Sequence, residues 1–333
     1  MKSYQTWVVP NLPEKRNHDR FIYIFLDGVG LGTANAQINP FAKFDSTFFS
    51  VHGGGDSARF PGEIISTDAH MSIEGLPQSA TGQTALFTGY NGAQIVGRHI
   101  NGFPTFSLRP YLKTASLFNR LLETGYKATL LNSYSDRYLK RLNHRRAERM
   151  MSASSLLQMG SGQPYFTIED YLQGKSMYMD ITNWFLRKHG QKISLVKPEE
   201  SGRKLARLAR EYDTVVYEYF FTDKIGHEQS WGAAKRILSH VDGLLSGVWE
   251  EIDPQVDTVI VSSDHGNMED LSTKSHTHNK VGTLLGGKHA AYLAKSIQYL
   301  YDIPRQILKL KNVEFLENIV LHDNGQTVET AEV

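Results

Sequence analysis

The sequence predicts an α/β fold in which a doubly wound, mainly parallel β-sheet is covered by helices on both faces. Short, continuous apolar runs recur along the 333 residues, as expected of strands that are buried on both faces. Helical patterns lie between these runs, and this alternation is typical of parallel sheets with crossover helices. Hydrophobic residues make up 40% of the chain, which is enough for a sizeable core, and we expect a single domain over residues 1–333.

The predicted strands and helices follow one another in a regular order. The first strand is the run "FIYIFL" at Phe21–Leu26, and later strands are expected within residues 126–133, 213–221 and 256–263. Each of the later strands follows a helical pattern, and these patterns occupy residues 114–125, 198–212 and 233–252. The first of the helical patterns ends in Gly125, a typical helix stop.

Two stretches do not fit the alternation of strand and helix. Residues 44–75 are rich in glycine, serine and aspartate, and residues 135–172 carry a basic run followed by "GSGQP". Loops that follow the strands of an open α/β sheet collect around the ligand crevice. We therefore expect both stretches to be lid or cap insertions in the single domain.

Composition and charge exclude several classes of function. The 36 basic and 35 acidic residues nearly cancel, so no overall charge favours nucleic acid or an anionic membrane as a partner. The chain has no cysteine, which excludes disulfides, thiolate metal sites and a cysteine nucleophile. The N-terminal twenty residues lack the apolar stretch of a secretory signal, and no apolar run approaches the length of a membrane span. A soluble, cytoplasmic protein is expected.

Residues with metal-binding and catalytic chemistry stand where the predicted strands end. Asp27 follows the first strand in "FLDGVG", and "FTDKIGH" places Asp223 and His227 four residues apart, on one face if that stretch is helical. Asp264 and His265 end the last strand in "VIVSSDHGN". The "GVGLG" that follows the first strand lacks the G-x-G-x-x-G spacing of a dinucleotide site.

Two further loops add to this set. "KSHTHNKVG" contains His276 and His278, and "LPQSATGQT" places Ser79 and Thr81 before a helical stretch, where free backbone N–H groups suit a phosphate. The carboxyl ends of parallel strands meet at one edge of a sheet. Seven oxygen and nitrogen ligands are too many for one tetrahedral ion and about right for two ions with open positions.

The order and spelling of these segments resemble a known family. "DGVG", "QSATGQ", "DKIGH", "SDHGNMED" and "HTHN" each match, in order, a motif of the alkaline phosphatase superfamily. The match is strongest to its branch of cofactor-independent phosphoglycerate mutases and phosphopentomutases. The resemblance covers about residues 20–133 and 175–290, and it implies an alkaline-phosphatase-like fold.

The resemblance implies two metal sites and a nucleophile. One site consists of Asp223, His227 and His276, and the other of Asp27, Asp264, His265 and the hydroxyl of Ser79. Ser79 stands where the family has its nucleophile, in a segment usually spelled N-S-x-x-G-H. Gln78 and Gln83 replace the Asn and the His of that segment, and Thr81 is therefore kept as a second candidate nucleophile.

Further candidates concern the substrate and the ions. His278 stands where the family has a residue that is not a ligand. Arg98, His99 and Lys175 are candidate substrate-binding residues. The basic run at 137–149 is either a solvated helix face or a source of phosphate contacts, and it lacks the interleaved aromatic residues of a nucleic-acid site. Carboxylate, imidazole and hydroxyl ligands suit Mn²⁺ or Zn²⁺.

The predicted activity is phosphoryl transfer to a small-molecule phosphorylated substrate. A serine hydroxyl is a poor nucleophile until a divalent cation lowers its pKa. A mutase must exclude water with a large lid, and the expected insertions are small. We therefore favour a phosphatase or phosphodiesterase-type hydrolase that forms a phosphoserine. A phosphomutase is the alternative, followed by a metal-binding protein without catalytic activity.

Overall fold

A six-stranded sheet forms the centre of the protein. The computed structural model describes residues 18–55, 60–142, 147–317, 319–321 and 327–329. Most of the first twenty residues, which lack the apolar stretch of a secretory signal, therefore lie outside the described residues. The strand order is β2-β8-β7-β1-β6-β3, with β1 Arg20–Leu26, β2 Glu63–Thr67, β3 Ala128–Leu130, β6 Thr214–Tyr219, β7 Asp257–Ser262 and β8 Val281–Gly287.

The sheet is mainly parallel, as predicted. Strands β7, β1, β6 and β3 pair in parallel, whereas β8 pairs antiparallel with both β7 and β2. All four predicted strands are present. Strand β8 was not predicted, because glycines interrupt its apolar run "VGTLLGG" and weaken the pattern that identifies a strand.

The central strand β1 shows why both faces of the sheet must be covered. Its alternate residues point to opposite faces. Phe21, Tyr23 and Phe25 belong to one apolar cluster, and Ile22 and Ile24 belong to another. Every one of these side chains is fully buried.

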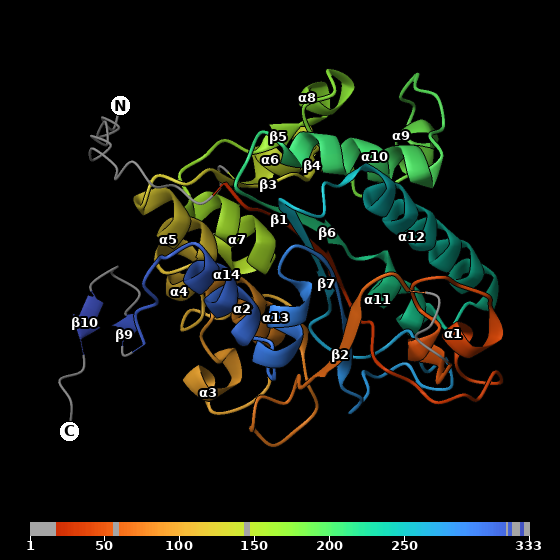
Figure 1. Ribbon diagram of the computed structural model, residues 1–333, viewed down its shortest axis with the longest axis horizontal. Coiled ribbons are helices and arrows are strands. Elements are labelled where there is room, and N and C mark those ends of the chain that lie inside the picture. Colours follow the sequence, from red (N-terminus) through yellow and green to blue (C-terminus); the bar gives the residue numbers. More distant parts are fainter. Residues whose placement is uncertain (1–17, 56–59, 143–146, 318, 322–326, 330–333) are drawn as a thin grey trace.

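Helices cover the two faces of the sheet separately (Figure 1). Helices α10 (Pro198–Ala209) and α12 (Trp231–Glu251) pack on each other and on one face. The opposite face carries α2 Ser79–Thr88, α4 Arg109–Thr114, α5 Leu117–Glu123, α7 Ala153–Gly160, α13 Ala290–Ser296 and α14 Asp302–Leu310. The predicted helices at 114–125, 198–212 and 233–252 correspond to α5, α10 and α12.

The segment at 44–75 is partly a strand of the sheet, which corrects the expectation of an insertion over its whole length. It contains the 3₁₀ helix η1 (Val51–Gly53) and β2, and β2 pairs along its full length with β8. Four of its five residues are exposed or half-buried, so no continuous apolar run marks this edge strand among its glycine-rich neighbours. Helix α1 (Pro40–Lys43) precedes the segment.

The segment at 135–172 is partly core. Its helix α7 buries Leu156 and Leu157 completely. Around α7 lie β4 Ser133–Tyr134, α6 Asp136–Leu142, η3 Ala147–Met150, β5 Phe166–Thr167 and α8 Ile168–Leu172, and β4 pairs in parallel with β5. The basic residues Arg137, Lys140 and Arg141 of α6 are exposed, whereas Arg145 and Arg146 lie outside the described residues.

The remaining elements are short. They are α3 Gly92–Val96, α9 Trp184–Lys188, α11 Phe221–Glu228, β9 Ile319–Leu321 and β10 Thr327–Glu329. Among the described residues, the structure contains no helix with the length and apolar character that a membrane span requires.

Candidate metal centre

The predicted acids and histidines converge because three neighbouring strands end at the same edge of the sheet. Asp27 follows β1, Asp223 lies in the first turn of α11 after β6, and Asp264 follows β7. Strands β7, β1 and β6 are adjacent and parallel. Their carboxyl ends therefore deliver the three carboxylates to one place, as expected for an open α/β sheet.

Two glycines allow the loops to approach closely. Gly28 has a φ of +67°, and a Cβ atom there would lie 2.7 Å from the Asp223 Oδ1 atom. A Cβ atom at Gly82 in α2 would lie 2.6 Å from the Asp264 carbonyl oxygen. Glycine at these positions lets Asp223 and helix α2 contact the loops after β1 and β7.

The first group of side chains surrounds the Nε2 atom of His265. This nitrogen lies 3.0 Å from the Ser79 Oγ atom, 3.5 Å from Asp27 Oδ1 and 3.4 Å from Asp264 Oδ2. His265 and Asp264 are completely buried. Ser79 is partly exposed at the first position of α2.

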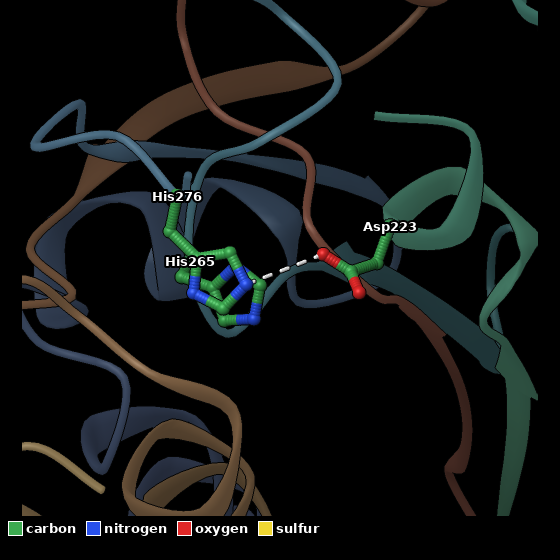
Figure 2. A group of neighbouring side chains, drawn as sticks. All are labelled: Asp223, His265 and His276. Carbon is green, nitrogen blue, oxygen red and sulfur yellow. Dashed lines mark ion pairs between the residues drawn. The ribbon is translucent and has the colours of Figure 1, made fainter. Parts of the chain in front are cut away.

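The second group consists of Asp223, His227 and His276. The His227 Nε2 atom lies 3.3 Å from Asp223 Oδ2 and 3.3 Å from the Nε2 atom of His276. Figure 2 shows the imidazoles of His265 and His276 face to face, with Asp223 directed at them; the ring centres are 3.7 Å apart. His265 therefore joins the two groups, and all seven predicted ligands form one cluster.

Backbone carbonyls fix the tautomer of all three histidines. The Nδ1 atom of His265 lies 3.3 Å from the Gly266 carbonyl oxygen, that of His276 3.3 Å from the Pro77 carbonyl, and that of His227 2.6 Å from the Lys274 carbonyl. A carbonyl can only accept, so each Nδ1 must donate. Each Nε2 then carries a lone pair that points into the cluster, the arrangement found around metal-binding histidines.

The protonation of the cluster also favours cation binding. Burial, reinforced by His265, lowers the pKa of His276 to about 4, and burial lowers the pKa of His265. Both rings are thus neutral near pH 7. Burial raises the pKa of Asp27, and the neighbouring Asp264 raises it further. Buried carboxylates beside lone pairs are costly unless a cation or a proton compensates them.

Two polar residues outside the predicted ligand set, Gln83 and Asn267, orient the cluster, and a third, Glu218, lies buried in the adjacent strand β6. Gln83 donates from Nε2 to Asp264 Oδ2 at 2.9 Å, so the residue that replaces the family's His contacts the same group of ligands. Asn267 donates from Nδ2 to Asp223 Oδ1 at 2.6 Å. Glu218 of β6 is buried, burial raises its pKa to about 7, and it accepts a hydrogen bond from Ser154. Glu218 could have been identified from the sequence, because it is an acidic residue within the apolar run "DTVVYEYFF".

Glu269 is a further residue that the sequence analysis did not single out. Its carboxylate is 1% exposed and accepts hydrogen bonds from four groups in three segments, which are the backbone N–H groups of Gly30 and Asn267, the Thr277 hydroxyl and the Asn279 amide. It therefore ties the loops after β1 and β7 to the segment that carries His276. Its place in the quoted motif "SDHGNMED" was its only signal.

We expect Glu269→Ala to lower the free energy of unfolding by about 3 kcal/mol, because buried donors lose their shared acceptor. Urea unfolding followed by circular dichroism measures the change. Glu74→Ala is the matched control, since Glu74 is exposed, and it should change stability by less than about 0.5 kcal/mol. Equal stability of the two variants would show that Glu269 does not hold these loops together.

The two candidate nucleophiles, Ser79 and Thr81, have different surroundings in the first turn of α2. Ser79 faces the cluster, whereas Thr81 is completely buried, donates from Oγ1 to the Gln78 carbonyl at 3.1 Å and accepts from the Ile100 N–H at 3.3 Å. The Ala80 N–H donates to the Ile100 carbonyl at 3.0 Å. The hydroxyl of Thr81 is thus engaged by the backbone and does not contact the described acids or imidazoles of the cluster.

The candidate substrate residues lie in different surroundings. Arg98 is exposed and His99 is half-buried, with its Nε2 atom 3.2 Å from the Ile73 carbonyl. Both precede Ile100, whose backbone is hydrogen-bonded to Ala80 and Thr81 in the first turn of α2. Lys175 is exposed three residues after α8. Substrate binding by these residues stays a prediction.

His278 has a partner outside the cluster. Its Nδ1 atom lies 3.0 Å from the Nε2 atom of His70, and the two rings are nearly parallel, with an interplanar angle of 8°. This contact agrees with leaving His278 out of the ligand set.

Comparison with known sequences gives partial matches. A family model described as the Metalloenzyme superfamily matches residues 189–315. The 2,3-bisphosphoglycerate-independent phosphoglycerate mutase of Clostridium kluyveri is 33% identical over 132 residues, which are 36% of this chain and 26% of that protein. The mutase of Desulforudis audaxviator is 34% identical over 125 residues, 34% of this chain and 25% of that protein. The chain thus spans about a quarter of the length of these relatives.

Comparison with solved structures concerns the fold. Leishmania mexicana phosphoglycerate mutase superimposes with a TM-score of 0.54 at 10% identity, over 93% of this chain and 97% of that one. A mutant of the alkaline phosphatase from the Antarctic bacterium TAB5 gives a TM-score of 0.50 at 12% identity, over 90% and 99% of the two chains. The match to the Metalloenzyme superfamily over residues 189–315 and the partial matches to phosphoglycerate mutases, together with the shared fold, support a member of the alkaline phosphatase superfamily near its 2,3-bisphosphoglycerate-independent phosphoglycerate mutases.

Proposed function

We propose that the protein is a metal-dependent phosphoryl-transfer enzyme, and specifically a phosphatase or phosphodiesterase-type hydrolase that works through a phosphoserine at Ser79. The observation that carries the proposal is the position of the Ser79 hydroxyl, 3.0 Å from His265 Nε2, at the edge of a cluster of carboxylates and inward-facing lone pairs. A nucleophile next to such a cluster is the arrangement that metal-assisted phosphoryl transfer requires.

The cluster fits two divalent cations. Asp223, His265 and His276 offer donor atoms within 4.8 Å of one another, and so do Asp27, Asp264 and His265. The Oδ1 atom of Asp27 is buried and lacks a hydrogen-bond partner in the described part of the chain. The facing lone pairs of His227 and His276 would repel each other without a cation between them. Mn²⁺ or Zn²⁺ suits these ligands.

The ions would favour the alkoxide of Ser79 and offset the negative charge of the phosphoryl oxygens. The Ser79 hydroxyl would give up its proton to solvent, and its Oγ atom would attack phosphorus in line. The bond between Oγ and phosphorus would form, and the bond to the leaving oxygen would break while that oxygen takes a proton from solvent. Water cleaves the resulting phosphoserine and regenerates the Ser79 hydroxyl. Gln83 and Asn267 hold Asp264 and Asp223 in place during both transfers.

Access of water supports hydrolysis over internal transfer. The His227 side chain is 41% exposed, and Ser79 is partly exposed. Part of each expected lid is built into the fold, as β2 in one segment and as α7 in the other. Little of the described chain is therefore left to seal the phosphoserine from water.

A phosphomutase is the second candidate, and the relatives favour it. The matched curated proteins are named phosphoglycerate mutases, and in a mutase a hydroxyl of the retained substrate replaces water. Formation of a positional isomer of a sugar phosphate or phosphoglycerate, without release of inorganic phosphate, would identify this activity.

Metal content and turnover of 4-nitrophenyl phosphate test the proposal together. We expect the protein to contain bound metal, to release inorganic phosphate and nitrophenol, and to lose activity after treatment with a chelator. Mn²⁺ or Zn²⁺ should restore the activity after the chelator is removed, because the ions are part of the site. Bound metal with no turnover of 4-nitrophenyl phosphate and of a panel of sugar phosphates would favour the non-catalytic metal-binding protein.

A further inference from the structure

A cavity lies outside the candidate metal centre. Its volume is about 560 Å³, within the range of small-molecule sites. Residues of α8 and α10 and of the loops around α9 line it, and Figure 1 shows these three helices along the same side of the molecule. None of the seven predicted metal ligands contributes to its lining.

Lys204 of α10 supplies the cationic group of this cavity. Its Nζ atom lies 4.1 Å from the centre of the Tyr171 ring and 3.5 Å from the Tyr171 carbonyl oxygen. Burial lowers the pKa of Lys204 to about 8, which leaves the ammonium group mostly charged at pH 7. Within the described part of the chain, no carboxylate lies at salt-bridge distance from it.

The other charges around the cavity do not compensate Lys204. Lys192 also lines the cavity and adds a second positive charge. Glu200 is the acidic residue of the lining, and Arg203 engages it at 2.6 Å, so its charge is already paired. The lining therefore carries more basic than acidic side chains, and Lys204 is a half-buried ammonium without a carboxylate partner in the described part of the chain, which an anion in the cavity would stabilise.

Most of the remaining wall is aromatic or aliphatic. Tyr171 and Tyr178 form one part, with ring centres 5.9 Å apart. Met177, Ile193 and Val196 are among the other apolar residues of the wall. Such a wall recognises a flat, apolar body, and the polar group next to it fixes the orientation of the ligand.

The turn at the base of the cavity is strained and held firmly. Ile181 has a φ of +64° and Asn183 a φ of +66°, a backbone region that is unusual for a β-branched residue such as Ile181. The Ser201 hydroxyl donates to the Ile181 carbonyl at 2.5 Å, and Asn183 donates from Nδ2 to the Ser194 carbonyl at 2.9 Å. Strain that several segments hold in place is typical of binding sites.

We propose that this cavity binds a small organic anion with an aromatic body, whose acidic group pairs with Lys204 and whose ring packs against Tyr171 and Tyr178. The site is separate from the proposed phosphoryl-transfer centre and does not depend on that activity. Carboxylate, phosphate and sulfonate share the chemistry that Lys204 recognises.

Titration of the whole protein with 1-naphthoate tests the proposal. We expect saturable binding to one site, and at least tenfold weaker binding of the uncharged 1-naphthamide. Lys204→Met should weaken naphthoate binding tenfold or more, whereas Lys204→Arg should retain it. Lys127→Met is the matched control, because Lys127 is an exposed lysine that does not line the cavity, and it should change the affinity less than twofold.

Dependence on Lys204 also distinguishes this site from carboxylate binding at the candidate metal centre. Failure of the wild-type protein to saturate with naphthoate would overturn the proposal. Binding that Lys204→Met leaves unchanged would overturn it as well.

Chemical labelling of the wild-type protein keeps the test valid if Lys204→Met does not fold. The Lys204 amine attacks the aldehyde carbon of 4-formylbenzoate and forms an imine with loss of water, and cyanoborohydride then supplies hydride to give a stable secondary amine. We expect Lys204 to be labelled at least fivefold faster than Lys127 at pH 8, and naphthoate to slow this labelling. Peptide mass mapping measures both rates. Equal labelling of the two lysines, or no protection by naphthoate, would contradict the proposal.

Discussion

Replacement of Ser79 by alanine should abolish phosphoryl transfer, with a loss of roughly three or more orders of magnitude in kcat. The variant removes the only atom that would form the bond to phosphorus, and it leaves the described acids and imidazoles in place. Initial rates with 4-nitrophenyl phosphate measure the loss, and elemental analysis should find that the metal stays bound. No phosphoserine should be detectable by mass spectrometry in the variant.

Thr81→Val is the matched control for this prediction. The variant removes a hydroxyl of the same helix turn, which bonds to the backbone of Gln78 and Ile100. We expect a loss of stability of about 1–3 kcal/mol, because the Ile100 N–H loses its acceptor, with activity reduced less than tenfold. Full activity of Ser79→Ala, combined with an inactive Thr81→Val, would transfer the nucleophile to Thr81.

Asp264→Asn and His265→Ala should lower the metal content from about two ions per chain towards one, together with the activity. Both residues are completely buried and approach Ser79 and Asp27 from the end of β7. The amide introduced by Asp264→Asn keeps the shape of the side chain but lacks its negative charge. Elemental analysis of purified protein measures the ions, and His278→Ala is the control, because His278 contacts His70 and not the cluster.

The pH dependence of metal binding gives a second measurement of the same centre. Burial raises the pKa of Asp264 to about 6, so below this pH a proton on Asp264 competes with the ion. Below pH 6, we expect the apparent metal affinity of the wild type to fall about tenfold per pH unit for each proton that the bound metal displaces. The pH dependence should be weaker in Asp264→Asn. Unchanged metal content in both variants, or an affinity that is independent of pH, would contradict the two-ion arrangement.

The central strands were predictable from the sequence, because each is a continuous apolar run that can be recognised locally. The run at Phe21–Leu26 is apolar on both faces because β1 lies in the middle of the sheet. The edge strand β2 was not found, because most of its residues are exposed or half-buried and its sequence resembles the loop around it. Strand β8 was missed because its glycines carry no side chain to reveal a pattern.

The chemical types of the site were likewise predictable, but its internal connections were not. The positions of Asp27, Asp223 and Asp264 after strands follow from the alternation of elements. The tautomer of His276 depends on the carbonyl of Pro77, which is almost two hundred residues away in the chain. The four hydrogen bonds to Glu269 join three separate segments, and no local pattern encodes such a convergence.

The sequence by itself determined the α/β class and the central strands, because the apolar pattern of a segment is a local property, and the resemblance of its motifs to a known family implied the set of seven candidate ligands. Only the tertiary structure decided that His265 contacts both groups of ligands and that Ser79, not Thr81, faces the cluster. It also decided that Lys204 lies in a cavity without a counter-ion in the described part of the chain. These facts depend on contacts between segments distant in the chain, which form only when the sheet brings its strand ends and helices together.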